Sequence, residues 1–317
     1  MISQFKRYQL TAIFIYGFFC NTLLADNRDY IFPYHQSISH SNYGGGGLIM
    51  NPSARFHEEG TLALRWTNFD PYIRGAIIAY PFDWLEASYQ YTDINNALYS
   101  DIEAFSGDQT YKDKGFDLKF RIFKEREAIP NIALGIRDIA GTGVFSSEYI
   151  AFSKYIGNFD FTFGLGWGHL SDNGKYRNPL GKISNSMYSR GAMDSSTQGG
   201  EVSLDSFFTG NMGLFGGFEY FFPNLHGARL KIEYSGIDYD QEGFPTEDSF
   251  SFAYEDVRKP QSKFNIGFEY PLNEYFKIDA SFVKGNTFNF GITVALPLGN
   301  NNSIIKKKNN KPIKVEN

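Results

Sequence analysis

Few residues of this chain have types and spacings suited to catalysis or metal binding. His169 and Asp172 precede a serine-rich stretch, so a Ser/His/Asp hydrolase site could be assembled there. No serine, however, lies in the G-x-S-x-G motif of one large hydrolase class. None of the histidines shows metal-ligand spacing; they are His35, His40, His57, His169 and His226. We therefore expect no enzyme, no catalytic residue, no bound metal and no cofactor.

Charged side chains form a more regular pattern, because they recur at every second position of segments whose other positions are apolar. The candidates are Arg65, Glu86, Asp117, Lys119, Arg121, Arg137, Asp160, Arg229, Lys231, Glu233, Lys263, Glu269, Lys277 and Asp279. With Glu219 they comprise eight basic and seven acidic residues. Such a balance favours a network of ion pairs that fills an interior over a pore selective for one sign of charge.

The alternation that positions these charges predicts β-strands. In segment 159–168 the apolar positions are Phe159, Phe161 and Phe163, and the intervening ones are Asp160 and Thr162. We count twelve such segments, of which the second and sixth alternate poorly. They begin near Thr61, Tyr72, Trp84, Lys114, Asn131, Ser146, Phe159, Gly213, Ala228, Ser262, Phe276 and Thr287.

Composition narrows the class of protein. Aromatic residues make up 18% of the 317 residues, which excludes a disordered chain. The net charge of −5 excludes a strongly basic nucleic-acid binder. A mean hydropathy of −0.34 excludes a bundle of membrane helices. Many aromatics in a chain that is polar on average favour an all-β fold, an antiparallel transmembrane β-barrel of about twelve strands of the outer-membrane type.

The alternative is a soluble β-sandwich or barrel, which also alternates. Loop lengths favour the membrane barrel, because the three long connections, 93–113, 169–212 and 237–261, are the third, seventh and ninth. Odd connections of an antiparallel barrel share one rim, and outer-membrane barrels place long loops outside the cell. We therefore expect both termini in the periplasm.

The N-terminal 25 residues resemble a secretory signal peptide. Lys6 and Arg7 precede an apolar stretch at 10–19, and cleavage after Ala25 would suit the small residue there. A single membrane anchor and a lipoprotein with a lipidated Cys20 are the alternatives. Cleavage after Ala25 would leave no cysteine, and therefore no disulfide.

The rest of the chain divides into three parts. Residues 26–60, with the run Gly44–Gly47, are predicted to form a periplasmic arm or a plug in the lumen; the run lacks the Gly-Lys-Ser/Thr ending of a phosphate-binding loop. Residues 61–299 are predicted to form the barrel. Residues 300–317 hold five lysines against one acid, which is typical of a disordered tail.

Two further features bear on the lumen and the loops. Gly164, Gly166 and Gly168 share one face of one strand, where they allow a bend, aromatic packing against bare backbone, or space for a plug or a passing chain. Loops 93–113 and 237–261 are acidic and most simply solvated; calcium binding is an alternative, and Tyr, Asn and Asp on loops 93–113 and 169–212 also suit carbohydrate contact. Twelve strands do not decide whether the lumen is open.

Several stretches, in order along the chain, resemble the YjbH family of outer-membrane exopolysaccharide-biosynthesis proteins, related to a group 4 capsule protein. They are 47–55 (GLIMNPSAR), 84–93 (WLEASYQYTD), 105–121 (FSGDQTYKDKGFDLKFR), 137–143 (RDIAGTG) and 159–168 (FDFTFGLGWG). The resemblance implies a barrel encoded with polysaccharide-production genes, and it implies no catalytic residues. Members of the family tend to be longer, with a second barrel-like half. This chain has one such half, so a fragment, a split partner and a shorter form are the alternatives.

These expectations combine into a non-enzymatic outer-membrane barrel in exopolysaccharide or capsule export or assembly. A general or substrate-specific porin is the alternative, and a hydrolase is a third. The expected partners are outer-membrane lipids, lipopolysaccharide, the polysaccharide and other proteins of the exopolysaccharide operon; nucleic acid is not expected.

Overall fold

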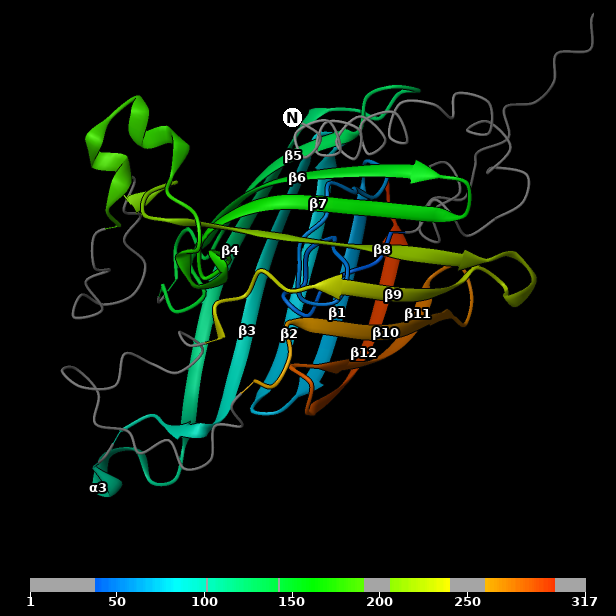
Figure 1. The fold of residues 1–317 in the computed structure, drawn as a ribbon. Coiled ribbons are helices and arrows are strands. Elements are labelled where there is room, and N and C mark those ends of the chain that lie inside the picture. The colour runs from blue at the N-terminus through cyan, green and yellow to red at the C-terminus, as the bar shows by residue number, and fades with distance from the viewer. Residues whose placement is uncertain (1–37, 101, 142, 191–205, 240–259, 300–317) are drawn as a thin grey trace, which may run out of the picture.

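The structure is a computed structural model that describes residues 38–100, 102–141, 143–190, 206–239 and 260–299. Twelve antiparallel strands form one closed barrel, in which each strand pairs with its neighbours in sequence and β1 pairs with β12 (Figure 1). The strands are β1 (Thr61–Phe69), β2 (Tyr72–Phe82), β3 (Leu85–Leu98), β4 (Thr110–Phe123), β5 (Asn131–Arg137), β6 (Ser147–Ile156), β7 (Phe159–Gly168), β8 (Met212–Phe222), β9 (Ala228–Tyr234), β10 (Phe264–Pro271), β11 (Phe276–Val283) and β12 (Thr287–Pro297). The predicted fold class is therefore confirmed.

The two faces of the strands differ as the alternation requires. Along β7 the outward Phe159, Phe161 and Phe163 are exposed, whereas the inward Asp160 and Thr162 are buried. Phe290 on β12 is 58% exposed and Ile266 on β10 is 49% exposed, although both are large apolar side chains. A soluble barrel would hide such residues, and a lipid-facing wall exposes them. The barrel is thus of the transmembrane type, with its polar face inside.

Aromatic side chains gather on the outer wall close to the short connections. Phe82 stacks on Trp84 with ring centroids 5.4 Å apart, and Trp84 stacks on Phe120 at 6.3 Å. Farther around the barrel, Phe159 on β7 contacts Tyr220 on β8 at 4.8 Å. Girdles of this kind lie at the membrane–water interfaces of outer-membrane barrels.

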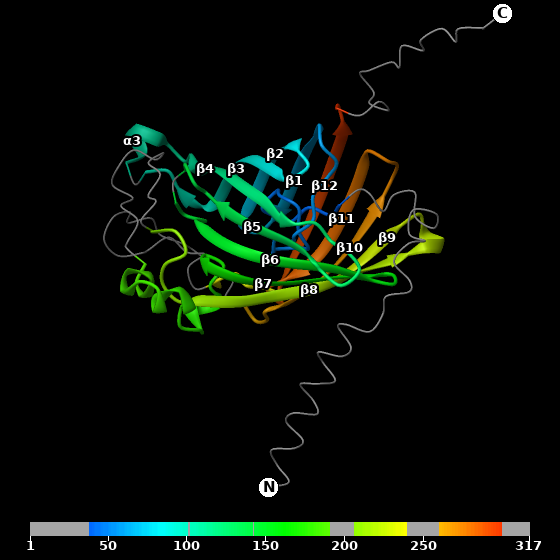
Figure 2. The same cartoon turned by 90° about the horizontal axis from the view of Figure 1, so that it is seen from above.

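The long connections share one rim. Figures 1 and 2 show the helix α3 (Glu103–Ser106), which follows β3, on the same side of the barrel as the short 3-10 turns that follow β7. Within the described residues, no helix combines the length and the apolar character needed to cross a membrane. The connection predicted at 93–113 is shorter in the structure, because β3 continues to Leu98 and β4 begins at Thr110.

Some predictions fall on residues that the structure does not describe. These are the signal peptide at 1–25, Cys20, the first part of the 26–60 segment, most of the acidic stretch at 237–261, part of the loop 169–212 and the lysine-rich tail at 300–317.

Candidate functional site: a lumen filled by residues 38–57

Residues 38–57 lie inside the barrel, directly ahead of β1, and we call them the plug. Every plug residue except the half-buried Gly45 is buried. The plug folds on itself: the Asn42 N–H donates to the Ile49 carbonyl at 2.7 Å, and the Leu48 N–H donates to the Asn51 carbonyl at 2.9 Å. Apolar plug residues join wall residues in one buried cluster, so the hydrophobic core of this barrel lies in its lumen.

Glu233 on β9 holds the turn of the plug. Its carboxylate accepts three consecutive backbone N–H groups, from Ile49 at 3.0 Å, Met50 at 2.8 Å and Asn51 at 3.2 Å. Asn265 Nδ2 donates to the same carboxylate at 2.8 Å. Such bonds to a charged acceptor are stronger than those between neutral groups. The carboxylate thereby satisfies main-chain donors that would otherwise be buried without partners.

The side-chain amide of Asn51 makes the same pair of hydrogen bonds to the wall as the backbone of a neighbouring strand would. Its Nδ2 donates to the Tyr234 carbonyl at 2.8 Å, and its Oδ1 accepts from the Gly236 N–H at 2.9 Å. The amide therefore continues the hydrogen bonding at the end of β9, where the chain turns into the 235–263 connection.

Basic wall residues bind plug carbonyl groups. Lys119 Nζ donates to the Arg55 carbonyl at 2.8 Å and to the Gly46 carbonyl at 3.3 Å. Lys231 Nζ donates to the Leu48 carbonyl at 3.3 Å, and Lys277 Nζ donates to the Ile38 carbonyl. A lysine has three donors, so each can bind the plug and a wall carboxylate together.

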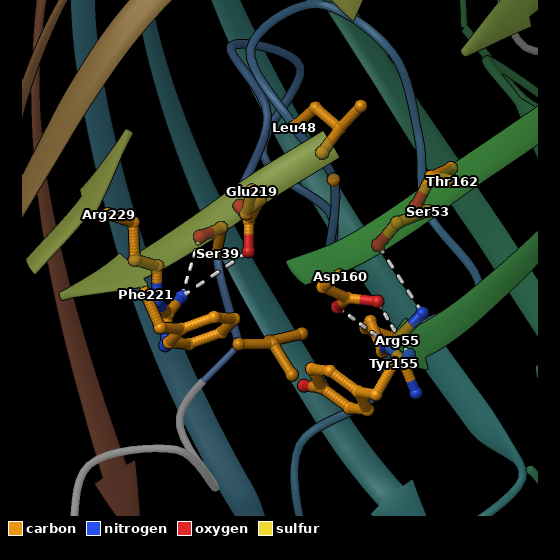
Figure 3. A pocket seen from close by; sticks show the side chains of 12 residues that line it. Ser39, Leu48, Ser53, Arg55, Tyr155, Asp160, Thr162, Glu219, Phe221 and Arg229 are labelled. Atoms are coloured by element: carbon orange, nitrogen blue, oxygen red, sulfur yellow. Dashed lines mark hydrogen bonds and ion pairs between the residues drawn. The ribbon is translucent and has the colours of Figure 1, made fainter. Parts of the chain in front are cut away.

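Arg55 is the only Lys, Arg, Asp or Glu of the plug. Its guanidinium forms a two-point ion pair with Asp160 on β7, with Nε–Oδ2 at 2.8 Å and Nη2–Oδ1 at 2.6 Å (Figure 3). It also binds Glu125. Asp160 lies opposite Glu219 in the β7–β8 register. Like charges at opposed positions repel, so the plug supplies the positive charge that this pair of strands lacks.

A small cavity of about 10 Å³ lies beside Arg55, between the plug and β6, β7, β8 and β9 (Figure 3). Its lining includes Ser39, Asp160, Glu219 and Arg229. That volume holds about one water molecule, so there is no room here for a second chain beside the plug.

At the rim with the long connections the plug is held by rings and cations. The Tyr43 ring lies 4.0 Å from the Arg74 guanidinium and 4.4 Å from that of Arg137, and it contacts Phe145 edge-on at 5.8 Å. Its hydroxyl is 2.9 Å from His169 Nε2. Burial and the nearby cations Arg74 and Arg137 lower the pKa of His169 well below its usual value, so the ring is neutral at physiological pH.

Arg74 is 3% exposed, and its two terminal nitrogens make no hydrogen bond to the described residues. The guanidinium is instead surrounded by rings, with Phe145 at 4.3 Å and Tyr72 at 4.7 Å in addition to Tyr43. Attraction of a desolvated cation to ring faces is worth about 2 kcal/mol or more, and it offsets part of the cost of burying this charge.

Wall charges also bind one another. The Glu269 carboxylate lies 3.1 Å from Arg229, 2.7 Å from Lys231 and 3.4 Å from Lys277. Glu86 pairs with Lys119 at 2.7 Å, and two further pairs, Arg65–Asp279 and Lys231–Glu219, measure 2.6 and 3.6 Å. The lumen is therefore a connected network of nearly balanced charge.

The structure places all fourteen predicted lumen residues toward the interior. Ten are buried: Arg65, Glu86, Lys119, Arg137, Asp160, Arg229, Lys231, Glu233, Glu269 and Lys277. Four are half-buried: Asp117, Arg121, Lys263 and Asp279. Of these, Asp117 accepts from Gln90, Arg121 pairs with Asp83, Lys263 pairs with Asp172, and Asp279 pairs with Arg65.

The three glycines have different local roles. A Cβ on Gly164 would lie 2.0 Å from the Phe215 ring, so this position allows an aromatic ring to pack on bare backbone. A Cβ on Gly166 would meet the Leu170 carbonyl at 2.2 Å. Gly168 ends β7 with φ +62°, which glycine adopts without strain. The space that the first two leave is filled by wall and loop residues.

The arrangement around His169 does not resemble a hydrolase site. Its Nε2 faces Tyr43, and its Nδ1 has no hydrogen-bond partner among the described residues. Asp172 pairs instead with Lys175 and Lys263, both at 3.0 Å. Within the described part of the chain, no three His, Cys, Asp or Glu residues are grouped to hold a metal ion.

Sequence reasoning did not single out Tyr43, Asn51 or Arg74. Asn51 lies in the stretch 47–55 that carries the family resemblance, which was a usable signal. Arg74 lies on β2, one of the two segments that alternate poorly, and Tyr43 precedes the glycine run without any local pattern. Their importance depends on contacts between segments far apart in the chain.

The chain matches a known protein family over most of its length. Residues 39–317 match the family described as exopolysaccharide biosynthesis protein YbjH. An uncharacterized lipoprotein of Escherichia coli (strain K12), YjbH, is 43% identical over 256 residues, which cover 81% of this chain. The match covers 35% of the length of that relative.

Two solved barrels are similar at a low level. A KdgM porin in complex with disordered oligogalacturonate shares 9% identity with a TM-score of 0.37, covering 74% of this chain and 97% of its own. Outer membrane phospholipase A from Escherichia coli shares 10% identity with a TM-score of 0.32, covering 75% and 96%. These scores are too low to carry an inference about this chain. The family match over most of the chain, together with the 43% identical relative, shows that this protein belongs to the YjbH family, whose description is exopolysaccharide biosynthesis.

Proposed function

We propose that this protein is a non-enzymatic outer-membrane component of exopolysaccharide or capsule export or assembly. The observation that carries the proposal is a lipid-facing barrel whose lumen is polar and is occupied by its own plug, in a chain of the YjbH family. A barrel with an apolar outer wall and a hydrogen-bonding lumen provides a water-compatible route through lipid. Among the described residues His169 contacts Tyr43, and Asp172 pairs with Lys175 and Lys263; these pairings favour a transport or assembly role over hydrolysis.

The proposed location is the outer membrane of a Gram-negative cell, with both termini of the chain in the periplasm. The long connections on one rim support this orientation, because outer-membrane barrels place long loops outside. The relative from Escherichia coli is called a lipoprotein, so lipidation of Cys20 is an alternative to cleavage after Ala25. The proposed partners are outer-membrane lipids, lipopolysaccharide, the polysaccharide and other proteins of the exopolysaccharide operon.

A clean chromosomal deletion tests the proposal, with polysaccharide quantified separately in the medium, in the periplasm and on the cell surface. We expect loss of polysaccharide outside the cell and accumulation in the periplasm, reversed by the intact gene. Unchanged polysaccharide in every compartment would refute the export role.

A porin is the second candidate, since the strand number and polar lumen suit one. The plug argues against an open pore, because it is buried along nearly all of its length. Reconstitution in planar bilayers separates the two: a porin conducts steadily, whereas the plugged barrel is expected to stay closed.

A further inference from the structure

The wall recognises the plug mainly through the main chain of the plug. Glu233 and Glu86 accept plug N–H groups, the latter from Gly46 at 3.1 Å, and three lysines donate to plug carbonyls. Ser153 Oγ accepts from the Ala54 N–H at 2.9 Å, and Asn131 Nδ2 donates to the Ala54 carbonyl at 2.6 Å. These wall groups bind an uncharged chain of alternating donors and acceptors.

The glycine run allows this close approach. A Cβ on Gly45 would lie 2.4 Å from Glu86 Oε1, and a Cβ on Gly46 would lie 2.8 Å from Lys119 Nζ. Any larger residue would push the wall groups away from the backbone. The plug is thus shaped so that long charged side chains can reach its amide groups directly.

The charges of the wall are largely balanced before the plug is counted. Glu269 faces three cations, and Glu86 pairs with Lys119. The plug contributes one charged side chain, Arg55. Burial lowers the pKa of both His40 and His57 well below the usual value, so both rings are neutral. The lumen therefore fits an almost neutral polar occupant.

We propose that the wall groups holding residues 38–57 form a binding track for a neutral, polyhydroxylated chain, and that plug and saccharide compete for it. A sugar hydroxyl donates and accepts, as the amide groups of the plug do together, so Glu86, Lys119, Lys231 and Glu233 can bind either chain. A strongly anionic or cationic polymer would upset the balanced network. Every plug residue except Gly45 is buried against the wall, and the cavity beside Arg55 holds about one water molecule, so a saccharide can reach these wall groups only in place of the plug. This inference rests on the proposed function and names its substrate class.

The experiment uses the full chain with Cys20→Ser, reconstituted in planar bilayers. Glu233→Ala removes the acceptor of three plug N–H groups and should release the plug. Ala54→Cys with Ser153→Cys adds a disulfide that holds the plug, since the Ala54 nitrogen lies 2.9 Å from Ser153 Oγ. We expect the triple variant to conduct when reduced and to close when oxidised. Glu219→Ala is the matched control, because Glu219 pairs with Arg229 and Lys231 on the wall.

Saccharide binding is then measured by how often an added oligosaccharide interrupts the ion current through the barrel. Maltoheptaose is the neutral probe, and oligogalacturonate and chitosan oligomers are the charged ones. We expect maltoheptaose to interrupt the current of a barrel that lacks residues 38–57 and keeps Glu86, Lys119, Lys231 and Glu233. This should occur at about tenfold lower concentration than for either charged oligomer, a difference of about 1.4 kcal/mol in binding free energy.

Three results would overturn the inference: a reduced barrel that does not conduct, equal current in both redox states, or stronger block by a charged oligomer. A second variant without residues 38–57, checked for folding by its gel mobility before and after heating, must also conduct. None of these readouts depends on polysaccharide secretion, so failure of the track and failure of the export role are distinguishable.

Discussion

The outer and inner faces of the same strands are stabilised by different kinds of neighbour. On β7 the outward Phe159, Phe161 and Phe163 face lipid. Lipid favours any apolar side chain and makes no contact that requires a particular one. The inward Asp160 and Thr162 face particular atoms, those of Arg55 and of the Ser153 hydroxyl. The stability cost of an outward substitution should therefore depend on whether the new residue is apolar. The cost of an inward substitution should depend on whether the new residue keeps the contact with one particular partner.

The largest effect is expected at the centre of the inner network. Glu269→Ala leaves Arg229, Lys231 and Lys277 buried without their shared carboxylate, which should cost about 3–5 kcal/mol of unfolding free energy. Urea unfolding in lipid vesicles, followed by tryptophan fluorescence, measures it. Glu274→Ala, at an exposed carboxylate in the next turn, is the control. Equal losses in the two variants would contradict a stabilising role of the buried carboxylate.

The outer face should respond to charge but not to shape. Phe163 lies in the middle of β7 and is 49% exposed. Phe163→Arg should cost about 2–4 kcal/mol, since an arginine near the bilayer midplane is disfavoured. Phe163→Leu should cost less than about 1.5 kcal/mol. The same unfolding assay compares them, and an arginine tolerated as well as the leucine would argue that this face does not meet lipid.

A conservative substitution of an inward-facing residue should lower stability more than the similarity of the two residues suggests. Arg55→Lys keeps the charge but loses the two-point contact with Asp160, which should cost about 1–2 kcal/mol. Arg126→Lys, at an exposed position, should leave stability unchanged. If both variants unfold at the same urea concentration, stability does not depend on the two-point geometry of the Arg55–Asp160 ion pair.

A pH-dependent effect is expected at Asp138, at the rim with the long connections. Burial beside Asp113 and Asp117 raises the pKa of Asp138 to about 8. The folded state then holds a proton that the unfolded chain loses near pH 4, so stability should fall as pH rises from about 4 to 8.

Asp138→Asn should flatten that part of the pH profile and raise the apparent Tm above pH 8. Asparagine tolerates the φ of +56° at this position. Thermal unfolding at a series of pH values measures the effect, with Asp83→Asn, a largely exposed carboxylate, as the control. Parallel profiles for wild type and Asp138→Asn would show that this carboxyl is ionised in the fold.

Much of the wall follows from the sequence. The predicted starts at Phe159, Ala228, Phe276 and Thr287 coincide with the observed ones. The alternation of apolar and polar residues identifies strands that face lipid on one side. It is lost where the strands extend beyond the lipid. For this reason the sequence predicts a loop at the end of β3 and the start of β4, where the outward residues Asp93 and Lys112 form an ion pair.

The contents of the lumen could not be predicted in the same way. The pattern places Glu233 on the inner face, but its partners Ile49, Met50 and Asn51 lie more than half the chain away. No local periodicity encodes such a pairing, because it depends on how the plug folds and where it sits. The run Gly44–Gly47 was visible, but its purpose, to admit Glu86 and Lys119 to the backbone, needs the three-dimensional arrangement.

The closed seam has a consequence for the timing of assembly. Thr61 on β1 pairs with Pro297 on β12, so the final contacts join strands from opposite ends of the barrel sequence. Contacts this distant form slowly, because a long loop must close first. The plug leads directly into β1 and is enclosed when the seam forms. We expect a plug that docks on the open sheet to be captured when the seam closes, whereas a plug that docks after closure has to enter through a rim.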